Sequence, residues 1–238
     1  GELLCVGSNP HKYFIIWLDL YDNSTYGALV FSEEESPVKF LISDLSSKKA
    51  VISWADSLFV IVYQTEDGKI RASRFDNKGV DIDNEDLYIA SGKTSGGIDI
   101  AFCDEGGIIV WNQNGIQCAR LSKEFKLLGR TGFTSFPLTK KNGWRPKICY
   151  GDGVFFLVYS TGDLYGERVR FDGTIIDQPS ILLCQDPGYV TANSFNIAFD
   201  GEQFLIVFRD DRYGNREGDI TLIKFDQQEN IEFETISK

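Results

Sequence analysis

The 238-residue sequence contains no methionine, and histidine occurs only once, at His11. Because His11 falls in a predicted turn, we expect neither a Ser-His-Asp triad nor a histidine-rich metal site. The missing initiator methionine and the first residue, Gly1, indicate a processed or truncated chain. A removed secretory signal would explain this, and so would the choice of chain ends. We therefore expect a secreted or cell-envelope protein.

Long hydrophobic runs and helix-forming runs are also absent. The apolar runs last about five or six residues, far short of the roughly 20 that span a bilayer, so membrane insertion is not expected. No glycine-rich phosphate loop precedes a helix, and no cofactor is predicted. The sequence is instead rich in residues of strands and turns, with 18 Phe, 10 Tyr and 23 Gly. This composition predicts an all-β protein.

Positive charge is scarce, because 24 Lys and Arg stand against 35 Asp and Glu, for a net charge of −11. Such a chain repels polyanions at long range, so nucleic acid is excluded as a partner. CxxC spacing is absent as well. The five cysteines are Cys5, Cys103, Cys118, Cys149 and Cys184. Their odd number and apolar neighbours favour buried small hydrophobic residues, with a disulfide or a metal site as the alternative.

Five repeats occupy the chain. Each has an apolar segment that ends in an aromatic anchor: Trp17, Tyr63, Trp111, Tyr159 and Phe208. Eleven residues before four of these anchors stand Ile52, Ile100, Ile148 and Ile197. In the first repeat we assign this place to Leu4, with two additional residues in the following turn. A fixed period of this kind predicts a repeat architecture.

Each repeat contains four short strands, which is the layout of a propeller blade. We predict a five-bladed β-propeller of four-stranded antiparallel blades, with about 48 residues per repeat. The domain is expected to be single, over residues 1–238. The expected repeats are residues 1–49, 50–97, 98–145, 146–194 and 195–238. Side-chain packing between the first and fifth blades would close the ring; a fragment of a six- or seven-bladed ring would show the same pattern.

The fifth repeat, residues 199–220, combines an Asp-Gly turn, an apolar strand, the turn Asp211-Arg212-x-Gly and the pair Asp219-Ile220. In these motifs it resembles the repeats of TolB-like and other bacterial WD40-like propellers. In size and blade number the chain is also similar to the five-bladed lectin tachylectin, without that lectin's repeat motifs. The resemblance implies a propeller, most of whose relatives are interaction scaffolds.

The loops between blades, and those joining second to third strands, converge on one face of a propeller, where ligands commonly bind. Asp211 and Arg212 fall in a long loop of this kind; they form either a self-satisfied turn or a recognition element. Trp144, Arg145 and Tyr189 fall in loops between blades. An exposed aromatic side chain there suits stacking on a sugar ring, although Trp144 could equally pack down as a lid.

Asp99, Lys147 and Asn196 each precede a repeated isoleucine, with Leu3 at this place in the first repeat. Strand alternation predicts that they share one side of the innermost strands, at the channel mouth. Asp99 and Lys147 would form an ion pair between adjacent blades, or these residues would contact a ligand. The acidic turn at Asp81-Ile82-Asp83 could hold calcium, but solvated carboxylates are the simpler interpretation.

These residues favour a non-catalytic recognition or scaffold propeller that binds a glycan or a protein as a monomer. The alternative is a carbohydrate-active enzyme. Glycoside hydrolysis uses two carboxylates that flank one bond. Because Asp99 is the only carboxylate that we place on an innermost strand, the sequence argues for binding.

Overall fold

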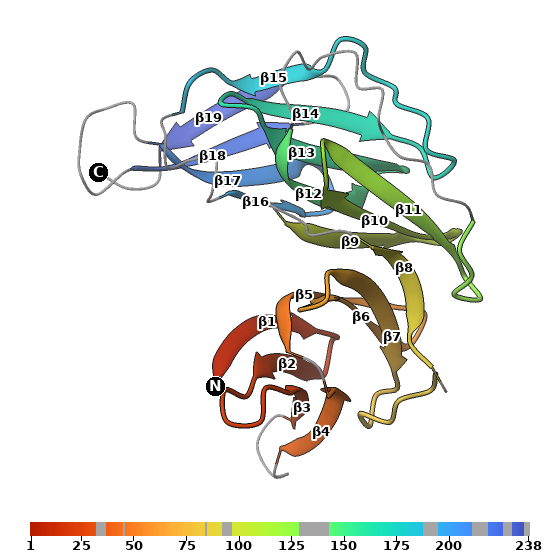
Figure 1. Ribbon diagram of the computed structural model, residues 1–238. Helices are drawn as coiled ribbons and strands as arrows, with labels where there is room; N and C mark the ends of the chain where they lie inside the picture. Colours follow the sequence, from red (N-terminus) through yellow and green to blue (C-terminus); the bar gives the residue numbers. More distant parts are fainter. Residues whose placement is uncertain are drawn as a thin grey trace. The chain divides into compact units, whose positions relative to one another are not determined.

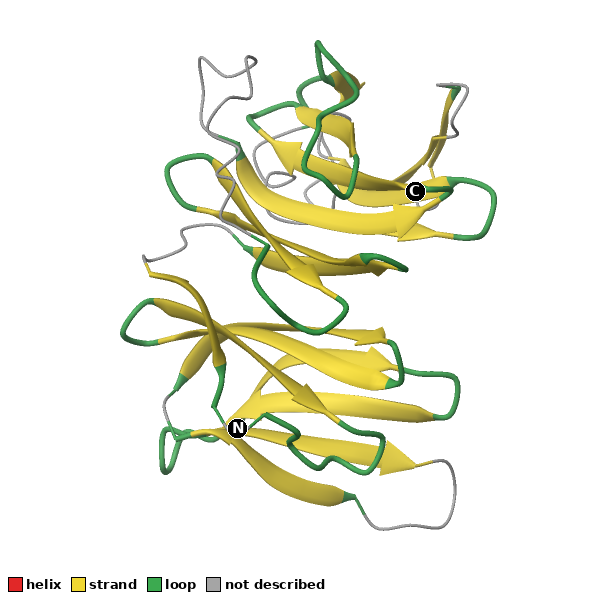
Figure 2. Cartoon of the chain, turned by 90° about the vertical axis from the view of Figure 1, so that its right-hand side faces the viewer, coloured by secondary structure: helices red, strands yellow, loops and turns green. Residues whose placement is uncertain are grey.

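The structure is a computed structural model that describes residues 1–31, 37–44, 46–83, 85–91, 97–128, 143–187, 195–210, 219–225 and 230–235. The chain divides into two compact units, Gly1–Thr94 (unit 1) and Ser95–Lys238 (unit 2). The described residues form strands and loops only (Figure 2). Accordingly, no helix among them is long and apolar enough to cross a membrane.

Unit 1 contains two four-stranded sheets (Figure 1). The first consists of β1 (Glu2–Ser8), β2 (Lys12–Leu18), β3 (Thr25–Phe31) and β4 (Val38–Ser43). The second consists of β5 (Ser47–Ala55), β6 (Leu58–Thr65), β7 (Lys69–Phe75) and β8 (Leu87–Ser91). In both sheets the strands lie side by side in chain order and pair antiparallel.

Unit 2 contains three sheets of the same kind. The described strands of the first are β9 (Ile98–Cys103), β10 (Gly106–Asn112) and β11 (Ile116–Ser122). The second consists of β12 (Trp144–Gly151), β13 (Val154–Ser160), β14 (Leu164–Val169) and β15 (Ile181–Cys184). The third consists of β16 (Phe195–Phe199), β17 (Phe204–Asp210), β18 (Asp219–Phe225) and β19 (Ile231–Thr235). The fourth strand expected near Ser135 lies outside the described residues.

These five antiparallel sheets confirm the predicted fold class, an all-β, five-bladed propeller fold. We name the sheets blades 1 to 5 in chain order, and the first strand of each is its inner strand. A strand pairs with the next one along the chain because each connection is short. The repeats of the sequence therefore correspond to blades.

Within each unit, the apolar cores lie between consecutive blades. In blade 4, Phe155 and Leu157 on β13 pack in one cluster with residues of blade 3. Phe156 and Val158 point to the opposite face of the sheet and pack in a second cluster with residues of blade 5. All four side chains are fully buried. A strand that is covered on both faces has consecutive apolar residues in its sequence. This explains the apolar run that precedes each aromatic anchor.

The first repeat has a different register from the one we expected. β1 contains a β-bulge between Leu3 and Cys5, and beyond it Val6 takes the place in the β1–β2 ladder that Ile52 takes in the β5–β6 ladder. Val6, rather than Leu4, is therefore the counterpart of the repeated isoleucines. Our assignment of Leu4 was wrong because it assumed two additional residues in the turn, whereas Val6 stands eleven residues before Trp17, as the isoleucines stand before their anchors.

The corrected register explains the glycine that follows. Gly7 takes the place of the small residue in the other inner strands, and a methyl group there would overlap with the Cγ2 atom of Ile52. The same shift makes Cys5, rather than Leu3, the counterpart of Asp99. The close approach of two inner strands thus selects glycine at position 7.

Candidate functional site

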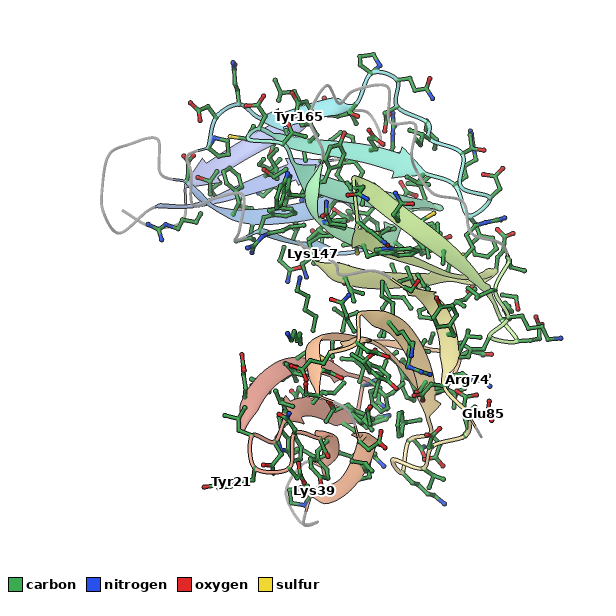
Figure 3. The ribbon with its side chains drawn as sticks, viewed as in Figure 1. Tyr21, Lys39, Arg74, Glu85, Lys147 and Tyr165 are labelled. Atoms are coloured by element: carbon green, nitrogen blue, oxygen red, sulfur yellow. The ribbon has the colours of Figure 1, made fainter. Side chains whose placement is uncertain are left out.

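Three neighbouring inner strands of unit 2 each carry one polar side chain at the same ladder position. Asp99 on β9, Lys147 on β12 and Asn196 on β16 all pair with a valine of the second strand of their blade. β12 contacts both β9 and β16. We call these three residues the polar arc; Figure 3 labels its central member, Lys147. Unit 1 has the apolar Cys5 and Val51 at the equivalent positions.

Asp99 joins blades 3 and 4. One carboxylate oxygen, Oδ2, accepts a hydrogen bond of 3.0 Å from the backbone N–H of Ile148 on β12. The other, Oδ1, accepts one of 3.1 Å from the N–H of Ile100. The ammonium group of Lys147 lies 3.9 Å from Oδ2. The ion pair between adjacent blades that the sequence predicts is thereby confirmed.

The electrostatics of Asp99 are a balance of opposing effects. Burial raises the pKa of its carboxyl group above the usual value, because a charge is poorly solvated in the interior. The positive charge of Lys147 and the two backbone N–H groups oppose this rise. Asp99 is thus a partly desolvated carboxyl group that already has three partners, which is the arrangement of a structural ion pair.

The side chain of Asn196, like that of Asp99, accepts a hydrogen bond from the N–H of the next residue, but Asn196 is more exposed. Its Oδ1 atom accepts a hydrogen bond of 3.0 Å from the N–H of Ile197, and the residue is exposed. Because the side-chain carbonyl is used in this way, its NH2 group is the part that remains to donate to a ligand. Among the described residues, none accepts a hydrogen bond from that group.

Trp144 begins β12, opposite Ser160 on β13, and its surface is 48% exposed. The segment is held in place from blade 3, because the buried side-chain amide of Asn112 donates to the carbonyl of Gly143. Trp144 stands three residues before Lys147 on the same strand, with a β-bulge between them. With about half of its surface exposed, Trp144 is not fully packed down on the protein.

Arg145 lies in the bulge that separates Trp144 from Lys147 and has a positive φ of 54°. An arginine in this left-handed region is uncommon and marks a sharply bent backbone. Among the other candidates from the sequence, Tyr189, Asp211 and Arg212 lie outside the described residues. The structure therefore brings Asp99, Lys147 and Asn196 to one edge of unit 2, with Trp144 and Arg145 on the central strand of that edge.

The acidic turn at Asp81 and Asp83 does not have the geometry of a calcium site. The carboxylate of Asp83 is bound to Arg74, at 2.8 Å from its backbone N and 3.0 Å from its Nε. In the described part of the chain, no group of three or more His, Cys, Asp and Glu residues could hold a metal ion. The five cysteines are all described; none forms a disulfide with another described residue, and each is buried or half-buried.

Two carboxylates were missed in the sequence. Glu2 is the first residue of β1, so Asp99 is not the only acidic residue of the inner strands. Within unit 2, however, Asp99 remains the only carboxylate on a described inner strand. The second is Glu167 on β14, which is fully buried. Its position in the alternating pattern of the third strand indicates burial, but a charged residue is normally expected at the surface.

No protein-family profile and no curated protein matches the chain. Solved structures do match it at the level of fold. The BP39L lectin from Burkholderia pseudomallei aligns with a TM-score of 0.67 and 11% identity, over 96% of this chain and 67% of the lectin. An α-L-arabinofuranosidase from Clostridium thermocellum aligns with a TM-score of 0.59 and 10% identity, over 100% of this chain and 93% of the enzyme.

TolB from Acinetobacter baumannii aligns with a TM-score of 0.56 and 12% identity, over 97% of this chain and 54% of TolB. At such low identities the likeness concerns the fold alone, because one propeller fold carries many functions. The three comparisons agree with the arrangement of the five sheets. The propeller expected from the repeats is thus confirmed, but kinship with TolB in particular is not.

Proposed function

We propose that the chain is a carbohydrate-binding propeller protein, and that the polar arc together with Trp144 forms its binding surface. The observation that carries this proposal is the exposed ring of Trp144 on the same strand as Lys147. A large aromatic side chain that stays 48% exposed beside polar groups has an apolar face free for contact. Sugars present such faces with hydroxyl groups at their edges.

The polar arc supplies partners for those hydroxyl groups. The ammonium group of Lys147 has three donors, and one 3.9 Å contact to Asp99 leaves others for a ligand. Asn196 offers its NH2 group on the next inner strand. An aromatic face with a few convergent polar groups is the usual composition of a small-molecule site.

The comparisons support a carbohydrate ligand, since the similar structures include a lectin and an arabinofuranosidase. They favour hydrolysis at least as much as binding. The side chains of unit 2 favour binding, because a hydrolase needs a second carboxylate beside the first. Asp99 is also engaged by two N–H groups and by Lys147, which limits its freedom to transfer a proton.

Hydrolysis is the second candidate. The observation in its favour is the raised pKa of the Asp99 carboxyl group, since a general acid must hold its proton near neutral pH. In this version Asp99 would donate a proton to the leaving oxygen. The base or nucleophile would come from a residue outside the inner strands of unit 2.

A glycan array followed by calorimetric titration of the best ligand tests binding. Trp144→Ala should weaken binding by about 5- to 150-fold, if the sugar stacks on the ring as strongly as a nucleic-acid base does, at about 1–3 kcal/mol. Tyr21→Ala is the matched control, because Tyr21 is fully exposed in unit 1. Absence of binding to every glycan, or equal losses in the two variants, would contradict the proposal.

Release of reducing ends from arabinose-, xylose- and galactose-containing oligosaccharides separates the two candidates. We expect binding without release. Turnover that Asp99→Asn abolishes, while glycan binding persists, would establish the hydrolase instead. Asp99→Asn keeps the size of the side chain and can still accept the N–H of Ile148, so loss of folding is not the expected result.

A further inference from the structure

Blades 2, 3 and 4 share the structure of the segment that follows their third strand. In each, the chain turns back and forms an isolated bridge with the end of the third strand. The three bridges are Phe75–Asp81, Leu121–Leu127 and Val169–Ile175. The residue after each bridge then donates its N–H to the carbonyl of an arginine: Arg74, Arg120 or Arg168. These three arginines therefore occupy equivalent positions.

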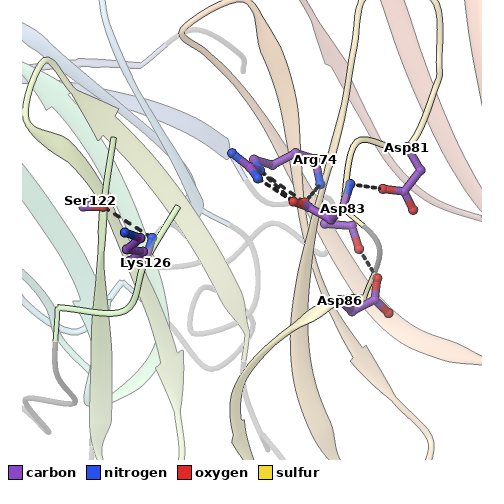
Figure 4. Close-up of polar contacts among 7 residues, drawn as sticks. Arg74, Asp81, Asp83, Asp86, Ser122 and Lys126 are labelled. Carbon is purple, nitrogen blue, oxygen red and sulfur yellow. Dashed lines mark hydrogen bonds and ion pairs between the residues drawn. The ribbon is translucent and has the colours of Figure 1, made fainter. Parts of the chain in front are cut away.

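In blades 2 and 4 the arginine binds an aspartate nine residues later. Asp177 accepts from the backbone N–H of Arg168 at 2.6 Å and from its Nε at 3.0 Å. Asp83 accepts from the same two groups of Arg74 at 2.8 and 3.0 Å (Figure 4). We call this arrangement the arginine–aspartate clamp. It is a receptor for one carboxylate, made of a guanidinium group and a main-chain N–H.

Blade 3 has the arginine and the turn without the aspartate. Figure 4 shows part of this turn, where the N–H of Lys126 donates to the Ser122 hydroxyl at 3.3 Å. Arg120 pairs with Ile108 on β10, as Arg168 pairs with Phe156 on β13, so its backbone N–H has the same orientation. Nine residues after Arg120, however, the sequence has Gly129.

The guanidinium group of Arg120 has only neutral acceptors among the described residues. It donates to the carbonyl of Leu128 at 3.2 Å and, weakly, to that of Phe171 at 3.5 Å. Its carbon lies 5.9 Å from the centre of the Phe171 ring. Its Nε atom is buried and has no hydrogen-bond partner in the described structure. A buried donor of a charged group without a partner carries a desolvation cost.

The surrounding sequence offers Arg120 no carboxylate in place of the missing aspartate. From Phe125 to Lys147 the chain has no Asp or Glu and six basic residues: Lys126, Arg130, Lys140, Lys141, Arg145 and Lys147. The charge of Arg120 acts on one described carboxylate, that of Asp172. Its pKa is lowered mainly by the N–H of Thr174, and least by the charge of Arg120. Asp172 therefore interacts with Arg120 only at long range, and no described ion pair joins them.

We propose that Arg120 is a binding site for the carboxylate group of a small organic acid, sugar acids included. The guanidinium group and backbone N–H of Arg120 would hold this carboxylate as the clamps of blades 2 and 4 hold Asp83 and Asp177. The proposal is independent of the polar arc, because it rests on a different strand and on the comparison between repeats.

Thermal unfolding of the full chain tests the site. Sodium acetate and sodium glucuronate are compared with sodium chloride at equal pH and ionic strength. At ten times its Kd, a bound carboxylate should raise Tm by roughly 3–6 °C. A larger shift with glucuronate than with acetate would identify a sugar acid as the better ligand. Equal shifts in all three salts would overturn the proposal.

Two variants locate the effect. Arg120→Lys keeps the charge but loses the two-pronged geometry of the guanidinium group. The apparent Kd, read from the dependence of the Tm shift on the concentration of the acid, should therefore rise at least tenfold. Gly129→Asp supplies the missing carboxylate from the chain itself; its Tm should be higher without any acid, and its response should disappear. A full response in both variants would place binding elsewhere. A response that appears only in Asp172→Asn would mean that Asp172 fills the site already.

Discussion

The buried carboxylate of Glu167 accepts a hydrogen bond from the hydroxyl group of Ser180 inside blade 4. The phenol of Tyr159 donates to the same oxygen, Oε1, at 2.9 Å. The second oxygen, Oε2, is buried without a partner in the described structure. A carboxyl group that is buried in this way, with one oxygen unpartnered, is more stable protonated than charged.

Blade 2 has the same network with the two groups exchanged. There the hydroxyl belongs to the third strand, as Ser73, and the carboxylate belongs to the connection thirteen residues later, as Asp86. Tyr63, the counterpart of Tyr159, donates to Asp86. Glu167 and Ser180 are separated by the same thirteen residues. Either arrangement gives the buried tyrosine a carboxylate acceptor, which is the function that the two blades have in common.

The stability of the protein should depend on the ionisation of Glu167. Burial raises its pKa to about 7, against hydrogen bonds from Ser180 and Tyr159 that lower it, and the charge of Asp177 adds to the rise. The folded state therefore holds the proton more tightly than the unfolded state. This contribution is complete below the unfolded value of about 4.5 and is lost as the pH rises through about 7.

We expect the free energy of unfolding to fall by up to about 3 kcal/mol between pH 4.5 and 7.5, at 1.36 kcal/mol per pKa unit. Glu167→Gln should remove this component, because glutamine does not titrate. Urea unfolding at several pH values measures it. Glu202→Gln, in the exposed turn before β17, is the control and should leave the slope unchanged. An unchanged slope in Glu167→Gln would show that Glu167 is not the titrating group.

In blade 4 the carboxylate of Glu167 and the hydroxyl of Ser180 should be exchangeable only when both residues are changed together. Ser180→Asp alone places two carboxylates together, and Glu167→Ser alone removes the acceptor of Tyr159. The double variant reproduces the pattern of blade 2. A double-mutant cycle measured by chemical denaturation should therefore give a coupling of about 1–3 kcal/mol in favour of the pair. Additive effects of the two changes would contradict the equivalence of the networks.

The arginine–aspartate clamps should differ in strength between blades. The side chains of Arg168 and Asp177 are 14% and 6% exposed, whereas those of Arg74 and Asp83 are 23% and 11% exposed. Removing one partner of a buried pair leaves an uncompensated charge and costs about 3–5 kcal/mol, less where water reaches it. Asp177→Ala should therefore destabilise the protein by about 3 kcal/mol, and Asp83→Ala by about 2 kcal/mol.

Urea unfolding of the two variants at pH 7 tests this order. Asp172→Ala is the control, because Asp172 is exposed enough to have little effect. The reverse order, or equal losses in all three, would contradict the link between burial and strength.

Much of the fold could be predicted because the aromatic anchors recur at nearly constant spacing, and a strand buried on both faces has an unmistakable apolar run. The Asp99–Lys147 pair could be predicted for the same reason, since equivalent positions of adjacent blades are neighbours. Buried polar networks could not. Glu167 looks like a surface residue until Ser180, thirteen residues away, is seen to be its partner. Leu4 was misassigned although Val6 stands eleven residues before Trp17, since the triplet around Leu4 looked more like the other repeats.

The corrected register makes a last prediction, at Gly7. A methyl group added there would meet the side chain of Ile52, whose Cβ and Cγ1 atoms would each lie 3.2 Å away and whose Cγ2 would overlap with it. Gly7→Ala should therefore destabilise unit 1 by about 1–3 kcal/mol, as overpacking of a filled core does. Ile52→Ala creates space but loses apolar contacts, so it destabilises as well. The double variant should be less unstable than the sum of the two, by at least about 1 kcal/mol, in a double-mutant cycle from urea unfolding. Simple additivity would mean that β1 and β5 can move apart at this point, and that glycine at position 7 serves the β1 backbone rather than the contact with Ile52.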